Sequence, residues 1–401
     1  AQATRVRLGS IAPWMSSTVG QINTADDVDY FRFILPRAGV LVVETTGSTD
    51  TVGTVWQDGE ELAGTDAGGM RRNFRLTTRV AEGTVVVAVE GNGSRTGDYT
   101  LETRLVVGFL ENPDHTSFQS GIGLLSGWVC TAEVVEIELD GALQEAAYGT
   151  ERLDTASACG DSDNGFGLLF NWNLLGDGEH EVVAYVDAVE LARVTVTVTT
   201  LGTEFLQGAE GLCGVEDFPR MDESVTLVWQ QSSQNFVLAD GPQLVGIPST
   251  PTASLTGVLE NPSPYSFQSG IGLISGWVCE AEAVEIRLGE LTPQVAAYGT
   301  ERRDTERACG DSDNGFGLLF NWNLLGDGEH EVVARVDGEE LGRTTVQVTT
   351  LGEEFVQGVE GMCVAEDFPR SGETVTLEWQ QAKQNFVITD IERALRGGEE
   401  D

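Results

Sequence analysis

The chain has 401 residues, of which 40% are hydrophobic and 22% are charged. Single domains cluster near about 100 to 150 residues, so we expect about three domains. The 64 acidic residues outnumber the 23 basic ones and give a formal net charge of −41. Such a field repels phosphate backbones and anionic lipids, which argues against nucleic acid as a partner, and no apolar run is long enough for membrane insertion.

The basic residues are almost all arginine, because Lys383 is the only lysine. This composition resembles that of salt-adapted proteins, and a high-GC genome that favours arginine codons is the alternative explanation. In both cases the self-repulsion needs screening, and the Debye length falls to about 3 Å near 1 M salt. We therefore expect the molecule to prefer salt or divalent cations.

The first part of the chain, residues 1–106, reads as a separate domain of short strands and turns. Its motifs are Asp29-Tyr30-Phe31, the turn from Gly47 to Asp50, the hairpin DGEELAGTDAGG, Asn73-Phe74 and the closing GDYTLE. Over most of residues 10–104 these motifs resemble the bacterial pre-peptidase C-terminal domain, a small jelly-roll β-sandwich found beside secreted peptidases and other exported proteins. Some members of that family bind calcium or collagen. We expect no peptidase domain in residues 107–401.

The rest of the chain is a duplication. GFLENPDHTSFQSGIGLLSGWVC, from Gly108, returns as GVLENPSPYSFQSGIGLISGWVC from Gly257, and ACGDSDNGFGLLFNWNLLGDGEHEVVA occurs twice without a change. The duplication predicts two units, at 107–239 and 257–390. A Pro-, Ser- and Thr-rich linker at 240–256 joins them, and an acidic tail follows at 391–401.

Nearly every periodic stretch alternates with period two, as half-buried strands require. Val135, Ile137 and Leu139 share one face, and Glu136 and Glu138 share the other. Only the segment from residue 390 to the end could form a short helix. The expected fold class is therefore all-β: a jelly-roll sandwich followed by two tandem sandwich units.

Each repeat resembles bacterial immunoglobulin-like modules over about 90 residues. The matching residues include Ser126-Gly127-Trp128, the run from Val135 to Gly141, and Ala147 to Thr150. The segment that follows Gly202 in the first unit, and Gly352 in the second, reads as an additional hairpin. Such modules serve as spacers and adhesive domains, so the resemblance implies no particular activity.

Three cysteines fall in each repeat, without any Cys-x-x-Cys pair and with only three histidines in the chain. This pattern gives almost no support to zinc or thioredoxin-like chemistry and favours disulfides in an oxidising compartment, so we expect a secreted or cell-surface protein. Trp128 and Cys130 point to one strand face. By similarity to immunoglobulin sandwiches, where a tryptophan packs on the inter-sheet disulfide, the expected bridges are Cys130–Cys159 and Cys279–Cys309.

Cys213 and Cys363 remain, one in each unit. Three alternatives are open for them: a bridge across the linker, a bridge between molecules, or two buried thiols. A bridge between molecules would make the chain a covalently cross-linked assembly subunit.

The DSDNG loop opens like a calcium-binding loop but departs from the EF-hand pattern, because its twelfth position holds Trp172 in place of glutamate. A looser calcium site with a distant carboxylate such as Asp177 is one interpretation, and an Asx-turn is the other. The acidic run of the first domain allows the same two interpretations. The calcium candidates are Asp161, Asp163, Asp311, Asp313, Asp26, Asp27, Asp29 and Asp50.

Two further features have structural interpretations. Phe170, Trp172 and Leu174 alternate onto one face, which favours a buried strand over a sugar-stacking platform. His180 and His330 follow a turn and are expected at the surface.

No G-x-S-x-G, H-E-x-x-H or Ser/His/Asp pattern is present, so we expect no enzyme. The sequence favours a structural or adhesive extracellular protein that self-associates, for example as a fibre subunit, or that binds a cell-surface or matrix partner. The alternative is a calcium-dependent module that binds a glycan or matrix protein.

Overall fold

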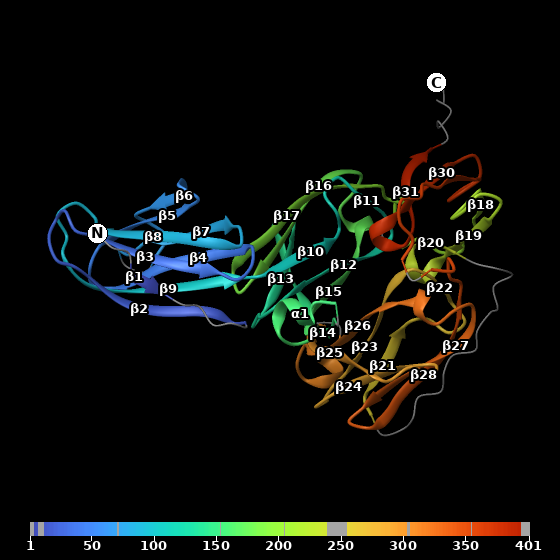
Figure 1. Cartoon of the computed structure of the whole chain (residues 1–401). Helices are drawn as coiled ribbons and strands as arrows, with labels where there is room; N and C mark the ends of the chain where they lie inside the picture. The colour runs from blue at the N-terminus through green and yellow to red at the C-terminus, as the bar shows by residue number, and fades with distance from the viewer. Residues whose placement is uncertain are drawn as a thin grey trace, which may run out of the picture.

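The computed structural model describes residues 4–6, 12–69, 72–152, 154–203, 205–238, 255–302, 305–353 and 355–393. These residues form an almost entirely β structure, so the predicted all-β fold class is confirmed. In Figure 1 the N-terminal domain lies at one end, the first repeat in the middle, and the second repeat beyond it. Among the described residues, no helix is both long and apolar enough to span a membrane.

The N-terminal domain is a sandwich of a five-stranded and a four-stranded sheet. The first has the order β1 (Thr4–Val6), β3 (Val28–Leu35), β8 (Gly83–Gly91), β5 (Thr51–Gln57) and β6 (Glu60–Thr65). The second has the order β2 (Trp14–Ile22), β9 (Gly97–Val106), β4 (Gly39–Gly47) and β7 (Arg75–Val80). Alternate residues such as Phe33, Val87 and Leu101 are 0% exposed and fill the space between the sheets.

Each repeat contains an eight-stranded sheet that is folded over its own core. In the first repeat the order is β10 (Gly108–Asn112), β12 (Ile122–Val129), β15 (Asp163–Asn171), β14 (Ala142–Glu151), β13 (Val135–Leu139), β16 (Gly178–Val186), β17 (Val189–Val198) and β11 (Phe118–Gln119). β14 joins the two layers, because Ala142 to Ala146 pair with β13 while Ala147 and Tyr148 pair with β15. The predicted inward face of Val135, Ile137 and Leu139 is confirmed.

The second repeat reproduces this sheet. Its order is β21 (Gly257–Asn261), β23 (Ile271–Val278), β26 (Asp313–Asn321), β25 (Gln294–Glu301), β24 (Val284–Leu288), β27 (Gly328–Val336), β28 (Glu339–Val348) and β22 (Phe267–Gln268). Helices are few and short: α1 (Ala156–Cys159), α2 (Glu306–Cys309), η1 (Trp172–Leu174), η2 (Gln231–Ser233), η3 (Trp322–Leu324) and η4 (Gln381–Lys383).

The additional segment of each repeat is a three-stranded sheet, and the prediction of a hairpin was wrong by one strand. The sheets are β18 (Leu212–Glu216), β19 (Ser224–Gln230) and β20 (Asn235–Leu238), and β29 (Met362–Glu366), β30 (Thr374–Gln380) and β31 (Asn385–Glu392). The helix expected from residue 390 is also wrong at its start, because Asp390 to Glu392 pair with β30. Residues 394–401 and most of the predicted linker, residues 240–254, lie outside the described residues.

The two three-stranded sheets share one hydrophobic core, so each covers its copy from the other repeat. Their aromatic contacts are reciprocal. Phe218 packs against Trp379 with ring centroids 5.0 Å apart, and the equivalent Phe368 packs against Trp229 at 4.8 Å. Reciprocal contacts between equivalent residues are the mark of a twofold interface. The repeats therefore form an approximately twofold pair within one chain. We call the two three-stranded sheets, with their shared core, the paired-sheet domain.

The N-terminal domain is packed tightly on the first repeat. Val40, Val42 and Val106 belong to the hydrophobic core of that repeat. Arg104 forms an ion pair with Asp187. Arg79 donates a hydrogen bond of 2.7 Å to the carbonyl of Leu191, and these contacts fix the domain against β17.

Two predicted core positions face elsewhere. Leu125 and Val129 fill the core of the first repeat, so Trp128 and Cys130 lie on the outward face of β12, against the N-terminal domain. The tryptophan in the repeat core is instead Trp172, which is 0% exposed. β15 ends at Asn171, and the following 3₁₀ turn directs Leu174 outward to 55% exposure, so the prediction of a buried Leu174 was wrong.

Candidate functional site

The most distinctive concave surface of the N-terminal domain lies on the outer face of its five-stranded sheet. The register places Tyr30 of β3 beside Ala88 of β8, and Ala88 beside Thr54 of β5. In the next outward row, Val86 lies between Arg32 and Trp56. Strand alternation turns the neighbours of these residues into the core, so the outward rows are free of core packing.

Two aromatic side chains stand on either side of a floor of small residues. Tyr30 is 37% exposed and Trp56 is 36% exposed, whereas the residues of β8 between them are alanine and valine. The resulting trough encloses about 590 Å³. Its lining consists of Val28, Tyr30, Thr54, Trp56, Asp58, Gly59, Thr84, Val86, Ala88 and Glu90. We call this surface the aromatic trough.

The sheet beneath the aromatic trough is held by close packing and one buried polar contact. A Cβ on Gly53 would lie 2.2 Å from Cε2 of Phe74, so only glycine allows this ring to pack under β5. The hydroxyl of Tyr99 donates a hydrogen bond of 2.7 Å to Asp29. Burial, with this carboxylate as a second cause, raises the pKa of Tyr99, so the phenol stays a neutral donor. These contacts join the floor of the trough to the core and to the second sheet.

The acidic residues of the first domain serve turns and strands in the structure. Oδ2 of Asp27 accepts hydrogen bonds from the backbone N–H and the amide of Asn23, at 2.8 and 3.0 Å. The backbone hydrogen bond is the main cause that lowers the pKa of Asp27. Asp50 accepts from Asn92, and Asp26 is exposed. Asp27, Asp29 and Asp50, three of the predicted calcium candidates, thus have separate partners.

The DSDNG loop is organised by Asn164. Its amide donates hydrogen bonds to Oγ1 of Thr155 at 3.0 Å and to the carbonyl of Asp161 at 2.8 Å, and the side chain is 0% exposed. Asp161 and Asp163 are exposed, and Asn314 repeats the same bonds in the second unit, beside Asp311 and Asp313. Among the described residues, no group of three or more His, Cys, Asp or Glu side chains is placed to hold a metal ion.

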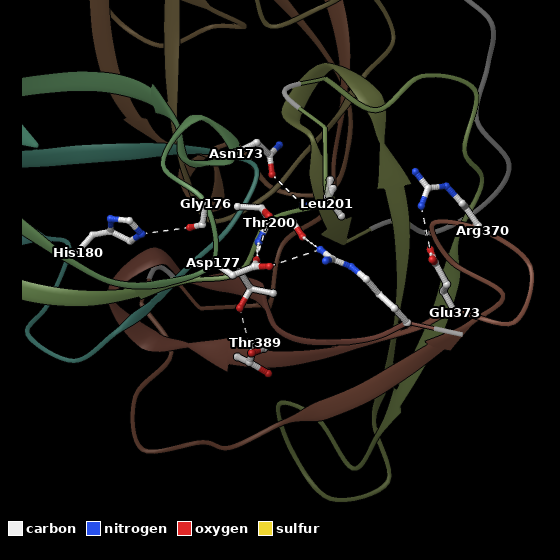
Figure 2. A network of polar contacts seen from close by, with 11 residues as sticks. Asn173, Gly176, Asp177, His180, Thr200, Leu201, Arg370, Glu373 and Thr389 are labelled. Carbon is white, nitrogen blue, oxygen red and sulfur yellow. Dashed lines mark hydrogen bonds and ion pairs between the residues drawn. The ribbon is translucent and has the colours of Figure 1, made fainter. Parts of the chain in front are cut away.

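Asp177, the distant carboxylate considered for a calcium site, has a different role. Its Oδ1 accepts hydrogen bonds from the N–H and the hydroxyl of Thr200, at 2.7 and 2.9 Å. Figure 2 shows these bonds beside the hydrogen bond that the N–H of Leu201 donates to Oδ1 of Asn173. Thr199 donates to the carbonyl of Thr389, so this network ties the first repeat to β31 of the second repeat.

The cysteines form three disulfides within the chain. Cys130 is bonded to Cys159, Cys279 to Cys309, and Cys213 to Cys363. No cysteine is free. Three alternatives were open for Cys213 and Cys363, and the structure shows the bridge across the linker, which joins the two repeats. This bridge contradicts both a bridge between molecules and two buried thiols. His180, expected at the surface, is half-buried, and its ring nitrogens contact Asp140 and the carbonyl of Gly176. Figure 2 shows the contact with Gly176.

The aromatic trough was not among the sites predicted from the sequence, although part of its signal is there. DYFRFIL alternates, and one of its two faces carries Tyr30, Arg32 and Ile34. The sequence alone does not say which face is the core. Trp56 lies 26 residues away on a strand that is not adjacent to β3, so only the sheet order brings the two rings to one surface.

No family model matches the chain, and no curated protein matches its sequence. Among solved structures it is similar to the pre-peptidase C-terminal domain of a Bacillus anthracis collagenase, with 15% identity, a TM-score of 0.22, and coverage of 25% of this chain and 94% of that one. It is also similar to PliG of Aeromonas hydrophila, a periplasmic inhibitor of g-type lysozyme, with 14% identity, a TM-score of 0.21, and coverage of 26% and 97%. A chimeric titin Z1Z2 tandem gives 12% identity, a TM-score of 0.14, and coverage of 59% and 94%. These scores are too low to assign the chain to a family.

Proposed function

We propose that the protein is an extracellular adhesive protein, without catalytic activity, that binds an extended glycan in the aromatic trough. The observation that carries this proposal is the pair of exposed rings, Tyr30 and Trp56, across a floor of small side chains. Tyr and Trp offer large, rigid contact area at low entropic cost, and they dominate the binding energy of many interfaces. Both rings can stack on the C–H faces of sugar units, and Asp58 and Glu90 at the margin can accept hydrogen bonds from sugar hydroxyls.

The rest of the molecule supports a role in which the chain presents the aromatic trough to a glycan outside the cell. Three disulfides are typical of proteins that function outside the reducing cytosol. The N-terminal domain shares core residues with the first repeat, and that repeat is bonded to the second, so the trough is held on a stiff support. A stiff support lowers the entropy lost when a polymer is bound.

A co-sedimentation experiment tests the proposal. The full chain is mixed with insoluble cellulose, chitin or peptidoglycan, and the bound fraction is compared among the wild type, Trp56→Ala and Tyr30→Ala. Because Met15 is exposed on the other sheet at 57%, Met15→Ala is the matched control. We expect at least one polymer to bind, with about tenfold weaker binding for each trough variant, as for a loss of about 1.4 kcal/mol. Unchanged binding by both trough variants, or no binding by the wild type, would overturn the proposal.

Self-association is a second candidate function, and the edge strand β2 favours it. β2 is nine residues long and lies at the end of its sheet, paired only with β9 among the described strands. Its outward face shows Met15 at 57% and Val19 at 78% exposure. A long edge with apolar side chains is a template for strand addition. Light scattering over a concentration series tests this idea: we expect Val19→Lys to remove any oligomer, and a monomeric wild type at all concentrations would exclude it.

A further inference from the structure

A second cavity lies where the two repeats meet the paired-sheet domain, remote from the aromatic trough. Its volume is about 400 Å³, which is within the range of small-molecule sites. Equivalent residues of both repeats line it, so it straddles the approximate twofold axis. These pairs are Asn112 and Asn261, Ile122 and Ile271, Gly123 and Gly272, Leu124 and Leu273, Asn235 and Asn385, Phe236 and Phe386, and Val237 and Val387.

One pair breaks the symmetry of this cavity. Where the first repeat has Ser233, the second has Lys383, which is the only lysine of the chain. Nζ of Lys383 donates a hydrogen bond of 2.5 Å to Oε1 of Gln119, from the opposite repeat. Ser233 instead accepts a hydrogen bond of 2.7 Å from Gln230 of its own repeat. The duplicated site thus carries a cation on one side only.

Among the described residues, no carboxylate acts as a counter-ion to this ammonium group. Lys383 is the only ionisable side chain among the described residues that line the cavity, although the chain has 64 acidic residues. Its pKa is lowered to about 7 by burial, and no carboxylate contributes. An ammonium group can donate three hydrogen bonds. Lys383 is half-buried, and an ammonium group without a carboxylate beside it is costly in such a place because burial disfavours the charged form. Titratable groups shifted in this way cluster at functional sites.

The other lining residues provide both polar atoms and apolar surface. Oδ1 of Asn112 and Oγ of Ser269 are buried and have no hydrogen-bond partner among the described residues. The equivalent of Ser269 in the first repeat, Ser120, accepts a hydrogen bond of 3.1 Å from the N–H of Ile388. The remaining wall combines Ile, Leu, Phe and Val with the polar side chains of Asn, Gln and Ser. This mixture suits a molecule with hydroxyl groups and an apolar ring face.

We propose that this cavity is a binding site for a small, hydroxylated monocarboxylate, such as a hexuronic acid, whose carboxylate pairs with Lys383. One ammonium group balances one negative charge, so a monoanion fits the site better than a phosphate dianion. The amides and hydroxyls of the wall bind the sugar hydroxyls, and the aliphatic and aromatic side chains contact the ring. The site is distinct from the aromatic trough and does not depend on it.

The unique lysine allows a direct test by NMR. Protein labelled with ¹³C only in lysine gives a single side-chain signal, and its loss in Lys383→Ser assigns it. We expect D-glucuronate to shift this signal saturably and to raise the pKa of Lys383, while D-glucose, a neutral sugar of the same ring size, leaves it unchanged. Since the ammonium form binds, the affinity should fall as the pH rises through about 7. The absence of a saturable shift with glucuronate, or an equal shift with glucose, would overturn the proposal.

Two variants separate binding at Lys383 from general effects on the fold. Lys383→Ser gives the second repeat the residue that the first repeat has, so we expect it to fold, and calorimetry should show at least tenfold weaker glucuronate binding. Gln119→Glu places an internal carboxylate against Lys383 at nearly unchanged volume. We expect it to raise the pKa of Lys383 and to compete with the ligand. Wild-type affinity in both variants would contradict the assignment.

Discussion

Cys213 and Cys363, which are 150 residues apart, form a disulfide that joins the same strand position of the two repeats. The bridge lies within the core that the two three-stranded sheets share. A tandem duplication commonly gives modules arranged in series, whereas here the second copy folds back on the first. The interface that could join two molecules is thereby used inside one chain, and any larger assembly has to form through other surfaces.

Removing this bridge should destabilise the paired-sheet domain. In the chain-entropy model, a loop of this length contributes up to about 5 kcal/mol, and the 30-residue loop closed by Cys279 and Cys309 roughly 3 to 4 kcal/mol. We therefore expect the double variant Cys213→Ser, Cys363→Ser to lower the melting temperature more than Cys279→Ser, Cys309→Ser. Scanning calorimetry measures both. Non-reducing gels should show only monomer for the wild type, and a covalent dimer would contradict the intramolecular pairing.

Gly53 should not tolerate a methyl group. In Gly53→Ala the new Cβ would lie 2.2 Å from the ring of Phe74, which is 0% exposed, so the domain must shift. Overpacking of this kind typically costs about 1 to 3 kcal/mol. Gly214→Ala, in β18, is the matched control, because no heavy atom lies within 4 Å of its added Cβ. Chemical unfolding compares them, and equal stability of both variants would show that Phe74 does not pack as described.

Asp187 should make the docking of the N-terminal domain sensitive to acid. Burial opposes its ionisation, but hydrogen bonds from the N–H groups of Val134 and Glu133 and the nearby Arg104 outweigh burial and lower the pKa of Asp187. Because the folded pKa lies below the unfolded value of about 3.9, its stabilising contribution is complete above that value. The contribution is lost as the pH falls through the folded pKa.

A matched pair of variants tests this acid sensitivity. Asp337 accepts the same two backbone hydrogen bonds in the second repeat, away from the N-terminal domain. We expect Asp187→Asn to cost more at pH 7 than Asp337→Asn, by up to about 1.5 to 3 kcal/mol for the lost charged hydrogen bond. Calorimetry at neutral and acidic pH measures the difference, which should vanish in acid. A difference that persists unchanged in acid would exclude the titration of Asp187 as its cause.

Local patterns predicted the strands well, because apolar and polar residues alternate along a half-buried strand and this alternation is visible in the sequence. The alternation around Ile137 identified the right face, since Glu136 and Glu138 mark the other face as polar. Trp128 was misplaced for the opposite reason. Both faces of β12 are buried, one by the repeat core and one by the N-terminal domain, so apolar residues occur on both.

Local patterns of this kind could not predict the contacts between distant parts of the chain. The bridge between Cys213 and Cys363 was one of three alternatives, because spacing does not say which copy a sheet packs against. The rings of Tyr30 and Trp56 meet on one surface only through the order of the strands. Lys383 was noticed as the only lysine, yet its place opposite Gln119 depends on the folding of one repeat against the other.

Calcium should stabilise the chain no more than magnesium does. The carboxylates of Asp161 and Asp163 are exposed, and the described residues contain no group of three or more ligands that could hold a metal ion. We expect equal shifts in melting temperature with calcium and magnesium chloride at equal ionic strength, both in the wild type and in Asp161→Asn, Asp163→Asn. A larger shift with calcium that disappears in this variant would establish a calcium site at the loop.

Salt itself should stabilise the fold. The formal net charge of −41 destabilises the compact state by self-repulsion, and screening relieves it. Screening also weakens exposed ion pairs such as Arg193 with Glu190, but each of these contributes only about 0 to 1 kcal/mol. The melting temperature should therefore rise with sodium chloride, and most steeply below about 0.5 M, where the Debye length changes most. A rise that stays linear to high salt would indicate exclusion of salt from the surface and would contradict charge screening as the cause.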